Sequence, residues 1–237
     1  MKAPVLMYHK VGAEKNGRPD KFLNVSTVDF ARQMRFLKRL GYTGITYEAV
    51  CMGLFQGSPL PKKPVCITFD DGYVNVLENA TAVLGDLGWP ATIFLPTEYV
   101  GRQNRWDIEF GNPQHNIMTW DQLRGLQDKG WEIAGHTHTH LNLGKSDDIV
   151  GSQEIVRGRQ EIADHLGKLP LTFCYPFGGY NEGTPALVRE AGFIGACTTK
   201  SGVSKDSTDP MQMPRVKVAY RDRLAGFIYR LMIRPLL

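Results

Sequence analysis

The sequence predicts an α/β protein in which parallel strands are covered by outer helices. Three observations carry this prediction: short apolar β-branched runs, segments of helical periodicity between them, and a glycine after each predicted helix. A strand followed by a helix, repeated at least five times, is typical of a parallel sheet. The periodicity leaves open whether this sheet is open or closed into a barrel. We expect a single domain over residues 1–237.

The predicted elements alternate along the chain. Apolar runs bounded by polar or glycine loops predict strands at Val5–Tyr8, Val65–Phe69, Ala91–Leu95, Trp131–Ala134, Leu171–Tyr175 and Phe193–Cys197. Helical periodicity predicts helices at Thr27–Leu40, Asn75–Leu87, Thr119–Lys129, Asp147–Leu166 and Thr184–Ala191. Ser26 and Asp29 resemble a capping box at the first helix, and the glycine after each helix is the usual left-handed terminator.

Composition argues against several classes of protein. Hydrophobic residues make up 42% and charged residues 22% of the chain, which is an ordinary globular mixture. The net charge of +4 is small and scattered, so we expect no nucleic-acid partner. The chain has no apolar run of about 18 residues that would predict a transmembrane helix. Its first residues, MKAPVLMYHKVG, lack the apolar stretch of a secretory signal, so the expected location is cytoplasmic.

The four cysteines are predicted to be buried free thiols. Cys51, Cys66, Cys174 and Cys197 lie far apart, with no CxxC spacing among them. This pattern favours a reducing compartment and disfavours a zinc site built from thiolates.

Polar residues directly follow several of the predicted strands. His9 follows the first strand, Asp70 and Asp71 follow the next, and three histidines lie within residues 136–140 after Trp131–Ala134. The carboxyl ends of parallel strands meet at one edge of a sheet, and ligands bind there. We therefore expect these side chains to gather at that edge.

The aspartates and histidines together favour a metal site. In helical geometry His136 and His140 would lie on one face and could reach one metal, whereas His138 would point elsewhere. Asp70 and Asp71 are adjacent carboxylates, which a cation would stabilise. The alternatives are capping of a polar turn by His and Thr side chains and capping of the next helix by an aspartate. One carboxylate and two histidines form a three-ligand site of the kind that activates water.

Two motifs resemble those of a known family. Thr68 to Gly72 reads TFDDG and His136 to His140 reads HTHTH. They are similar to the first two motifs of the polysaccharide deacetylases with the NodB homology fold, carbohydrate esterase family 4. The resemblance runs from about Val5 to Val218. It implies a distorted (β/α) barrel and hydrolysis of N-acetyl groups on an amino-sugar polysaccharide or a lipid-linked glycan precursor. It also implies a divalent metal, Zn²⁺ above all, with Co²⁺, Ni²⁺ or Fe²⁺ as alternatives.

The resemblance also implies roles for individual residues. Carried over from the family, Asp70 is the general base, and Asp71, His136 and His140 hold the metal. A third motif aligns with residues 174–178, and there the backbone N–H of Phe177 helps to bind the oxyanion.

The chain departs from the family pattern at two places. The arginine that usually orients the base is replaced by Cys174, and Arg215 is a candidate substitute. The C-terminal Leu-x-His that supplies the general acid is absent. However, residues 4–9, PVLMYH, resemble the opening of the poly-N-acetylglucosamine deacetylase branch, which implies that His9 is the acid. The alternative is that His9 is satisfied by a backbone carbonyl at a packed strand end.

Aromatic and C-terminal residues suggest further contacts. Tyr73, Trp106, Trp120 and Phe177 are candidates for stacking on sugars, with core packing as the alternative. Residues 222–237 are predicted to form an amphipathic helix. It either makes peripheral contact with an inner membrane through anionic lipid or docks on the barrel.

Two other functions are compatible with parts of the pattern. A protein that lacks both the usual arginine and the usual histidine could bind metal and glycan without catalysis. An iron oxygenase also uses two histidines and one carboxylate. That chemistry usually lies on double-stranded β sheets, which the helix-rich pattern here disfavours.

Overall fold

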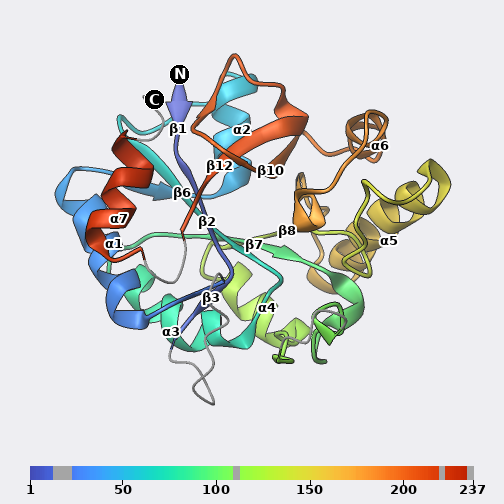
Figure 1. Ribbon diagram of the computed structural model, residues 1–237, viewed down its shortest axis with the longest axis horizontal. Coiled ribbons are helices and arrows are strands. Elements are labelled where there is room, and N and C mark those ends of the chain that lie inside the picture. Colours follow the sequence, from blue (N-terminus) through green and yellow to red (C-terminus); the bar gives the residue numbers. More distant parts are fainter. Residues whose placement is uncertain (13–22, 109–112, 219–221, 234–237) are drawn as a thin grey trace.

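A closed barrel of parallel strands forms the centre of the molecule. The computed structural model of the protein describes residues 1–12, 23–108, 113–218 and 222–233. Within these ranges seven parallel strands form the barrel, and helices flank it (Figure 1). The strand order is β2-β12-β10-β9-β8-β7-β6, and pairing of β2 with β6 closes the ring. The barrel strands are β2 (Val5–Tyr8), β6 (Pro64–Asp70), β7 (Thr92–Leu95), β8 (Glu132–Gly135), β9 (Thr172–Cys174), β10 (Gly195–Ser201) and β12 (Met213–Lys217).

The closed ring confirms the distorted (β/α) barrel that the resemblance implied.

Short strands outside the seven-stranded barrel form additional pairings. β5 (Thr43–Ile45) pairs with the first half of β6. β1 (Lys2–Ala3) pairs with β11 (Ser204–Lys205), and β3 (Lys10–Val11) pairs with β4 (Asn24–Val25).

The helices lie where the periodicity predicted them, with one addition. They are α1 (Thr27–Arg39), α2 (Tyr47–Phe55), α3 (Val74–Gly85), α4 (Trp120–Gln127), α5 (Asp148–Leu166), α6 (Thr184–Glu190) and α7 (Leu224–Ile228). The Ser26 side chain accepts a hydrogen bond from the Asp29 N–H at 3.1 Å and so caps α1, as predicted. The sequence analysis missed α2, a short helix in which Val50, Cys51 and Gly53 have low helix propensity.

The core is formed by the apolar strands and the inner faces of the helices. Val65, Ile67 and Phe69 of β6 are fully buried and belong to its largest cluster. All four cysteines are buried and free, as predicted. Across the described part of the chain, no helix is both long enough and apolar enough to span a bilayer.

The C-terminal segment is helical and packs on the barrel assembly. α7 continues as a π-helix over Tyr229–Ile233, and residues 234–237 of the predicted helix lie outside the described residues. Phe227 and Leu231 are buried in the largest core cluster, and α7 lies beside α1 (Figure 1). These contacts favour the docking interpretation of this segment.

Candidate active site at the carboxyl ends of the strands

The two aspartates lie at the carboxyl end of β6. Asp70 is the last residue of this strand, and Asp71 follows it in a left-handed conformation with φ 75°. The N-cap of α3 is Tyr73, which forms no side-chain capping hydrogen bond. Neither aspartate therefore caps this helix, and the alternative that an aspartate caps it is wrong.

The two outer histidines come together through a turn and not through a helix. His136 directly follows β8, and His140 lies four residues later in non-helical backbone. Thr137 and His140 have φ values of 60° and 61°, which lie outside the right-handed helical region. The expected helical spacing is therefore wrong. The turn nevertheless places Nε2 of His136 and Nε2 of His140 at 3.4 and 3.2 Å from Asp71 Oδ1.

These three side chains fit a cation site. Their ligand atoms lie within 4.8 Å of one another. Asp71 Oδ1 is buried and makes no hydrogen bond of normal geometry among the described residues. His136 Nδ1 lies 2.6 Å from the carbonyl oxygen of Cys174 and donates to it, so Nε2 is the nitrogen that faces Asp71. A carboxylate with two imidazoles is a donor set that suits Zn²⁺ and similar divalent ions.

The electrostatics keep the Asp71 carboxylate ionised. Burial raises the pKa of Asp71, but the neighbouring imidazoles of His136 and His140 outweigh burial and hold this pKa well below its usual range. An ionised carboxylate is the form that binds a metal.

Asp70 lies beside this group and is held by Arg215. Nη1 and Nη2 of Arg215 donate to the two carboxylate oxygens of Asp70 at 2.7 and 2.8 Å. Arg215 Nη1 also donates to Thr68 Oγ1, and Nε donates to the carbonyl oxygen of Thr198, both at 3.0 Å. The Arg215 guanidinium therefore binds Asp70, as expected of a substitute for the missing family arginine.

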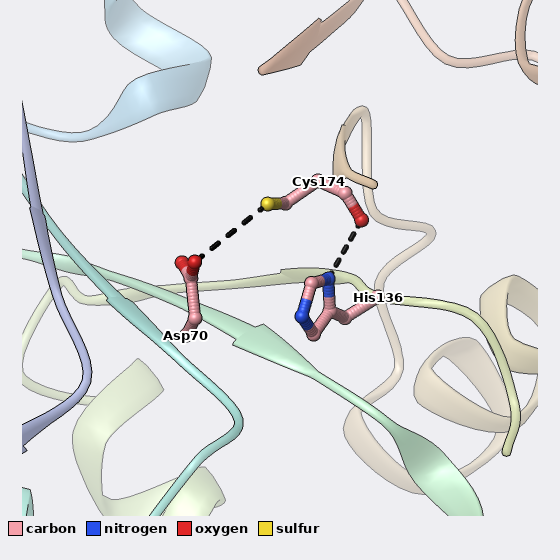
Figure 2. A group of neighbouring side chains, drawn as sticks. All are labelled: Asp70, His136 and Cys174. Carbon is pink, nitrogen blue, oxygen red and sulfur yellow. Dashed lines mark hydrogen bonds between the residues drawn. The ribbon is translucent and has the colours of Figure 1, made fainter. Parts of the chain in front are cut away.

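Cys174 lies between Asp70 and His136. Figure 2 shows its thiol directed toward Asp70 Oδ2, 3.9 Å away, and its carbonyl oxygen directed toward His136 Nδ1. Ligand atoms of these three residues also lie within 4.8 Å of one another. However, Arg215 Nη2 lies 3.1 Å from the sulfur and already compensates the Asp70 charge, so it would repel a cation there. The Asp71 group is the better cation site.

His9 follows β2 and joins the same site. Its Nε2 lies 3.7 Å from Asp70 Oδ2, and its side chain is 17% exposed. Burial lowers the pKa of His9 below its usual value, although the charge of Asp70 acts in the opposite direction.

Phe177 and Trp106 flank His140 on the accessible side. The Phe177 ring lies 4.6 Å from the His140 ring in an edge-on arrangement, and Phe177 is 48% exposed with φ 59°. The Trp106 ring stacks on His140 at 4.3 Å. Of the other two sugar-stacking candidates, Tyr73 is fully buried beside Trp106, and Trp120 stacks on His165.

The structure thus brings together His9, Asp70, Asp71, His136, His140 and Phe177. Residues 57–196 match the family described as polysaccharide deacetylase. The chain belongs to this family. YxkH of Bacillus subtilis (strain 168) is 27% identical over 218 residues, 92% of this chain and 72% of that protein. The poly-beta-1,6-N-acetyl-D-glucosamine N-deacetylase of Staphylococcus aureus (strain MRSA252) is 25% identical over 209 residues, 84% of this chain and 69% of that protein.

A solved structure supports the fold independently. The Streptococcus pyogenes deacetylase PplD in complex with acetate matches with a TM-score of 0.84 at 21% sequence identity. The match covers 98% of both chains, so the two proteins share the same barrel throughout.

Sequence reasoning missed two supporting groups at the site. The Thr68 hydroxyl helps to hold Arg215, and the Cys174 carbonyl orients His136. The first could have been found, because Thr68 lies two residues before Asp70 and residues at i and i+2 share a face of a strand. The second joins the His136 side chain to a backbone carbonyl of β9, and no pattern of side chains in the sequence reports it.

Proposed function

We propose that this chain is a metal-dependent N-deacetylase that hydrolyses N-acetyl groups on an amino-sugar polysaccharide or a lipid-linked glycan precursor. The observation that carries the proposal is the convergence of Asp71, His136 and His140 beside a second carboxylate, Asp70. Family membership and the named activity of the Staphylococcus aureus relative support the choice of an N-acetylated amino sugar.

Asp71, His136 and His140 would hold the cation, with Zn²⁺ as the first candidate and Co²⁺, Ni²⁺ or Fe²⁺ as alternatives. A bound divalent cation supplies Lewis acidity, which polarises an acetyl carbonyl and makes water a stronger acid. The remaining chemistry belongs to side chains of this protein.

Asp70 accepts the proton of the attacking water as the new carbon–oxygen bond forms at the acetyl carbon. Arg215 keeps this carboxylate ionised and turned toward the site. The backbone N–H of Phe177 donates to the developing oxyanion, and such donors contribute roughly 3 to 4 kcal/mol in other enzymes. His9, 3.7 Å from Asp70, takes up the proton that Asp70 accepted and passes it to the amine nitrogen as the carbon–nitrogen bond breaks. The products are the free amino sugar and acetate.

The test is the Asp70→Asn variant. We expect kcat to fall by about 10²- to 10⁴-fold because a general base is lost, while the zinc content stays at that of the unchanged protein. Turnover is followed by mass spectrometry of N-acetylglucosamine oligosaccharides, which lose an acetyl group and gain a hydrogen. Asp86→Asn, at an exposed residue after α3, is the matched control. Near-full activity of Asp70→Asn would show that the base is assigned wrongly.

The same assay separates catalysis from glycan binding alone. A protein that binds zinc and glycan without releasing acetate would be a binding protein. The bidentate hold of Arg215 on Asp70 favours catalysis, because it keeps a buried carboxylate charged.

A further inference from the structure

The turn between the two candidate histidine ligands adopts backbone conformations that need external support. Thr137 and His140 both have positive φ, which costs free energy for a residue with a side chain. Such conformations persist only where surrounding contacts hold them.

Glu154 of α5 supplies the most direct support. Its Oε2 accepts hydrogen bonds from the backbone N–H groups of His138, at 3.0 Å, and of Thr139, at 2.7 Å. Its Oε1 accepts from the Thr139 hydroxyl at 3.0 Å. Both carboxylate oxygens therefore bind the middle of the turn, through hydrogen bonds that the negative charge strengthens.

The backbone of α5 also lies directly against this turn. Gly158 follows Glu154 by one helical turn, and a Cβ atom placed on it would lie 2.8 Å from the carbonyl carbon and oxygen of Thr137. The Thr137 hydroxyl in turn accepts from the N–H of Leu141 at 3.1 Å. The helix and the turn are therefore fitted to each other without space between them.

His138 holds the turn from the other side. Its Nδ1 lies 2.9 Å from Thr97 Oγ1 and 3.1 Å from Glu161 Oε2. Its Nε2 lies 3.1 Å from Glu98 Oε2, and its carbonyl oxygen accepts from the Glu98 N–H at 3.0 Å. The middle histidine is thus an anchor that points away from Asp71, as the sequence predicted.

We propose that Glu154 is a positioning residue for the cation site. Its carboxylate fixes the turn so that His136 and His140 present their Nε2 atoms to Asp71 before a cation binds. This inference rests on the proposed function, because the site that Glu154 organises is the one assigned there to the metal.

The experiment measures zinc affinity of the full chain by competition with a chromogenic chelator. We expect Glu154→Ala to bind zinc about 10- to 100-fold more weakly, as is typical when a group that supports metal ligands is lost. Glu154→Gln should restore most of the affinity, because an amide oxygen still accepts from both N–H groups. Asp164→Ala, which removes an exposed contact with Gln160 on the same helix, should leave the affinity unchanged.

A purely structural role would give a different result. Glu154→Ala would then lower the Tm of the metal-free protein while zinc affinity stayed the same, and the proposal would be overturned. Should Glu154→Ala fail to fold, Thr139→Ala removes only one of the three hydrogen bonds and should weaken zinc binding by a smaller factor. Unchanged affinity in Thr139→Ala would also overturn it. If the unchanged protein binds no zinc, the proposed function is wrong. If it binds zinc and the Glu154 variants bind equally well, only the role of Glu154 is wrong.

Discussion

Arg215 carries its positive charge at a place that solvent does not reach. It is among the largest fully buried side chains of the described residues. Burial raises the pKa of the Asp70 carboxyl, but the charge and hydrogen bonds of Arg215 outweigh burial and bring this pKa below its usual value. A buried charge left without its partner would be strongly destabilising, so each member of the pair requires the other.

The Arg215→Lys variant tests this coupling. Lysine keeps the charge but cannot form two parallel hydrogen bonds to one carboxylate, so the pKa of Asp70 should rise. Because Asp70 must be ionised to act as a base, the acidic limb of the kcat–pH profile should move to higher pH. We expect kcat at neutral pH to fall by about 10-fold or more. Arg124→Lys, at an exposed ion pair with Asp121, is the control. An acidic limb at the same pH in both variants would contradict the coupling.

Glu132 is a buried carboxylate at the opposite end of β8 from the active site. Its Oε2 accepts from the Glu48 N–H and the Thr92 hydroxyl, both at 2.8 Å, and its Oε1 accepts from the Thr172 hydroxyl. Burial raises the pKa of Glu132 above its usual value, and these hydrogen bonds oppose the rise only in part.

The raised pKa predicts how stability depends on pH. The folded state binds the Glu132 proton more tightly than the unfolded chain does. The contribution of Glu132 to stability is therefore fully present below the unfolded-state pKa, about 4.3, and is lost as pH rises through the folded-state value. The free energy of unfolding of the unchanged protein should fall with pH relative to Glu132→Gln, which cannot titrate. Urea unfolding at several pH values measures this, with exposed Glu78→Gln as the control. Parallel pH curves for the protein and Glu132→Gln would refute the prediction.

At the scale of elements, α5 and the turn after β8 behave as one unit. Gly158 allows this contact, since a methyl group there would meet the Thr137 backbone. Gly125, inside α4, has no atom within 4 Å of the same position. The two helical glycines therefore differ in what surrounds them.

The two glycines predict opposite effects of the same substitution. Gly125→Ala should raise the free energy of unfolding by about 0.5 to 1 kcal/mol, because alanine has the higher helix propensity. Gly158→Ala should lower it by about 1 to 3 kcal/mol through overpacking, and should also weaken zinc binding. Urea unfolding and the chelator competition measure the two quantities. A stabilised Gly158→Ala variant with normal zinc affinity would show that the helix and the turn are not tightly coupled.

At the scale of the whole molecule, the sequence predicted those strands that consist of a continuous run of apolar residues. Val65–Phe69 is such a run, and it carries Asp70 to the edge of the barrel. β12 was not predicted as a strand, although it closes the barrel between β10 and β2. It contains Pro214, Arg215 and Lys217, so it lacks an apolar pattern. Arg215 is buried because it pairs with Asp70, 145 residues earlier, and no local pattern can report such a partner.

The candidate site likewise contains features that the sequence predicted and features that it could not predict. The residue types at the strand ends sufficed to predict which side chains would meet, because a parallel barrel collects those ends. The path of the chain between His136 and His140 could not be predicted, because contacts with α5 and with Glu98 decide it. Spacing alone suggested a helix where tertiary contacts impose a turn.

The C-terminal segment, α7 and the π-helix that follows it, is expected to contribute to the stability of the folded protein. Phe227 is fully buried in the largest core cluster, whereas Tyr229, two residues later, is 46% exposed. Arg230 Nε lies 2.6 Å from Asp222 Oδ2, which ties the π-helix to a residue just before the N-cap of α7. If the segment is apolar because it docks on the barrel, its buried and exposed aromatic residues should contribute very differently to the free energy of unfolding.

Phe227→Ala should lower the free energy of unfolding by about 3 to 5 kcal/mol, the range for a large buried side chain that leaves a cavity. Tyr229→Ala should change it by less than about 0.5 kcal/mol, because surface substitutions away from special contacts have small effects. Urea unfolding of both variants measures the difference. A segment that instead lies on a membrane surface would give similar small losses for both variants, together with binding to anionic vesicles that Tyr229→Ala weakens.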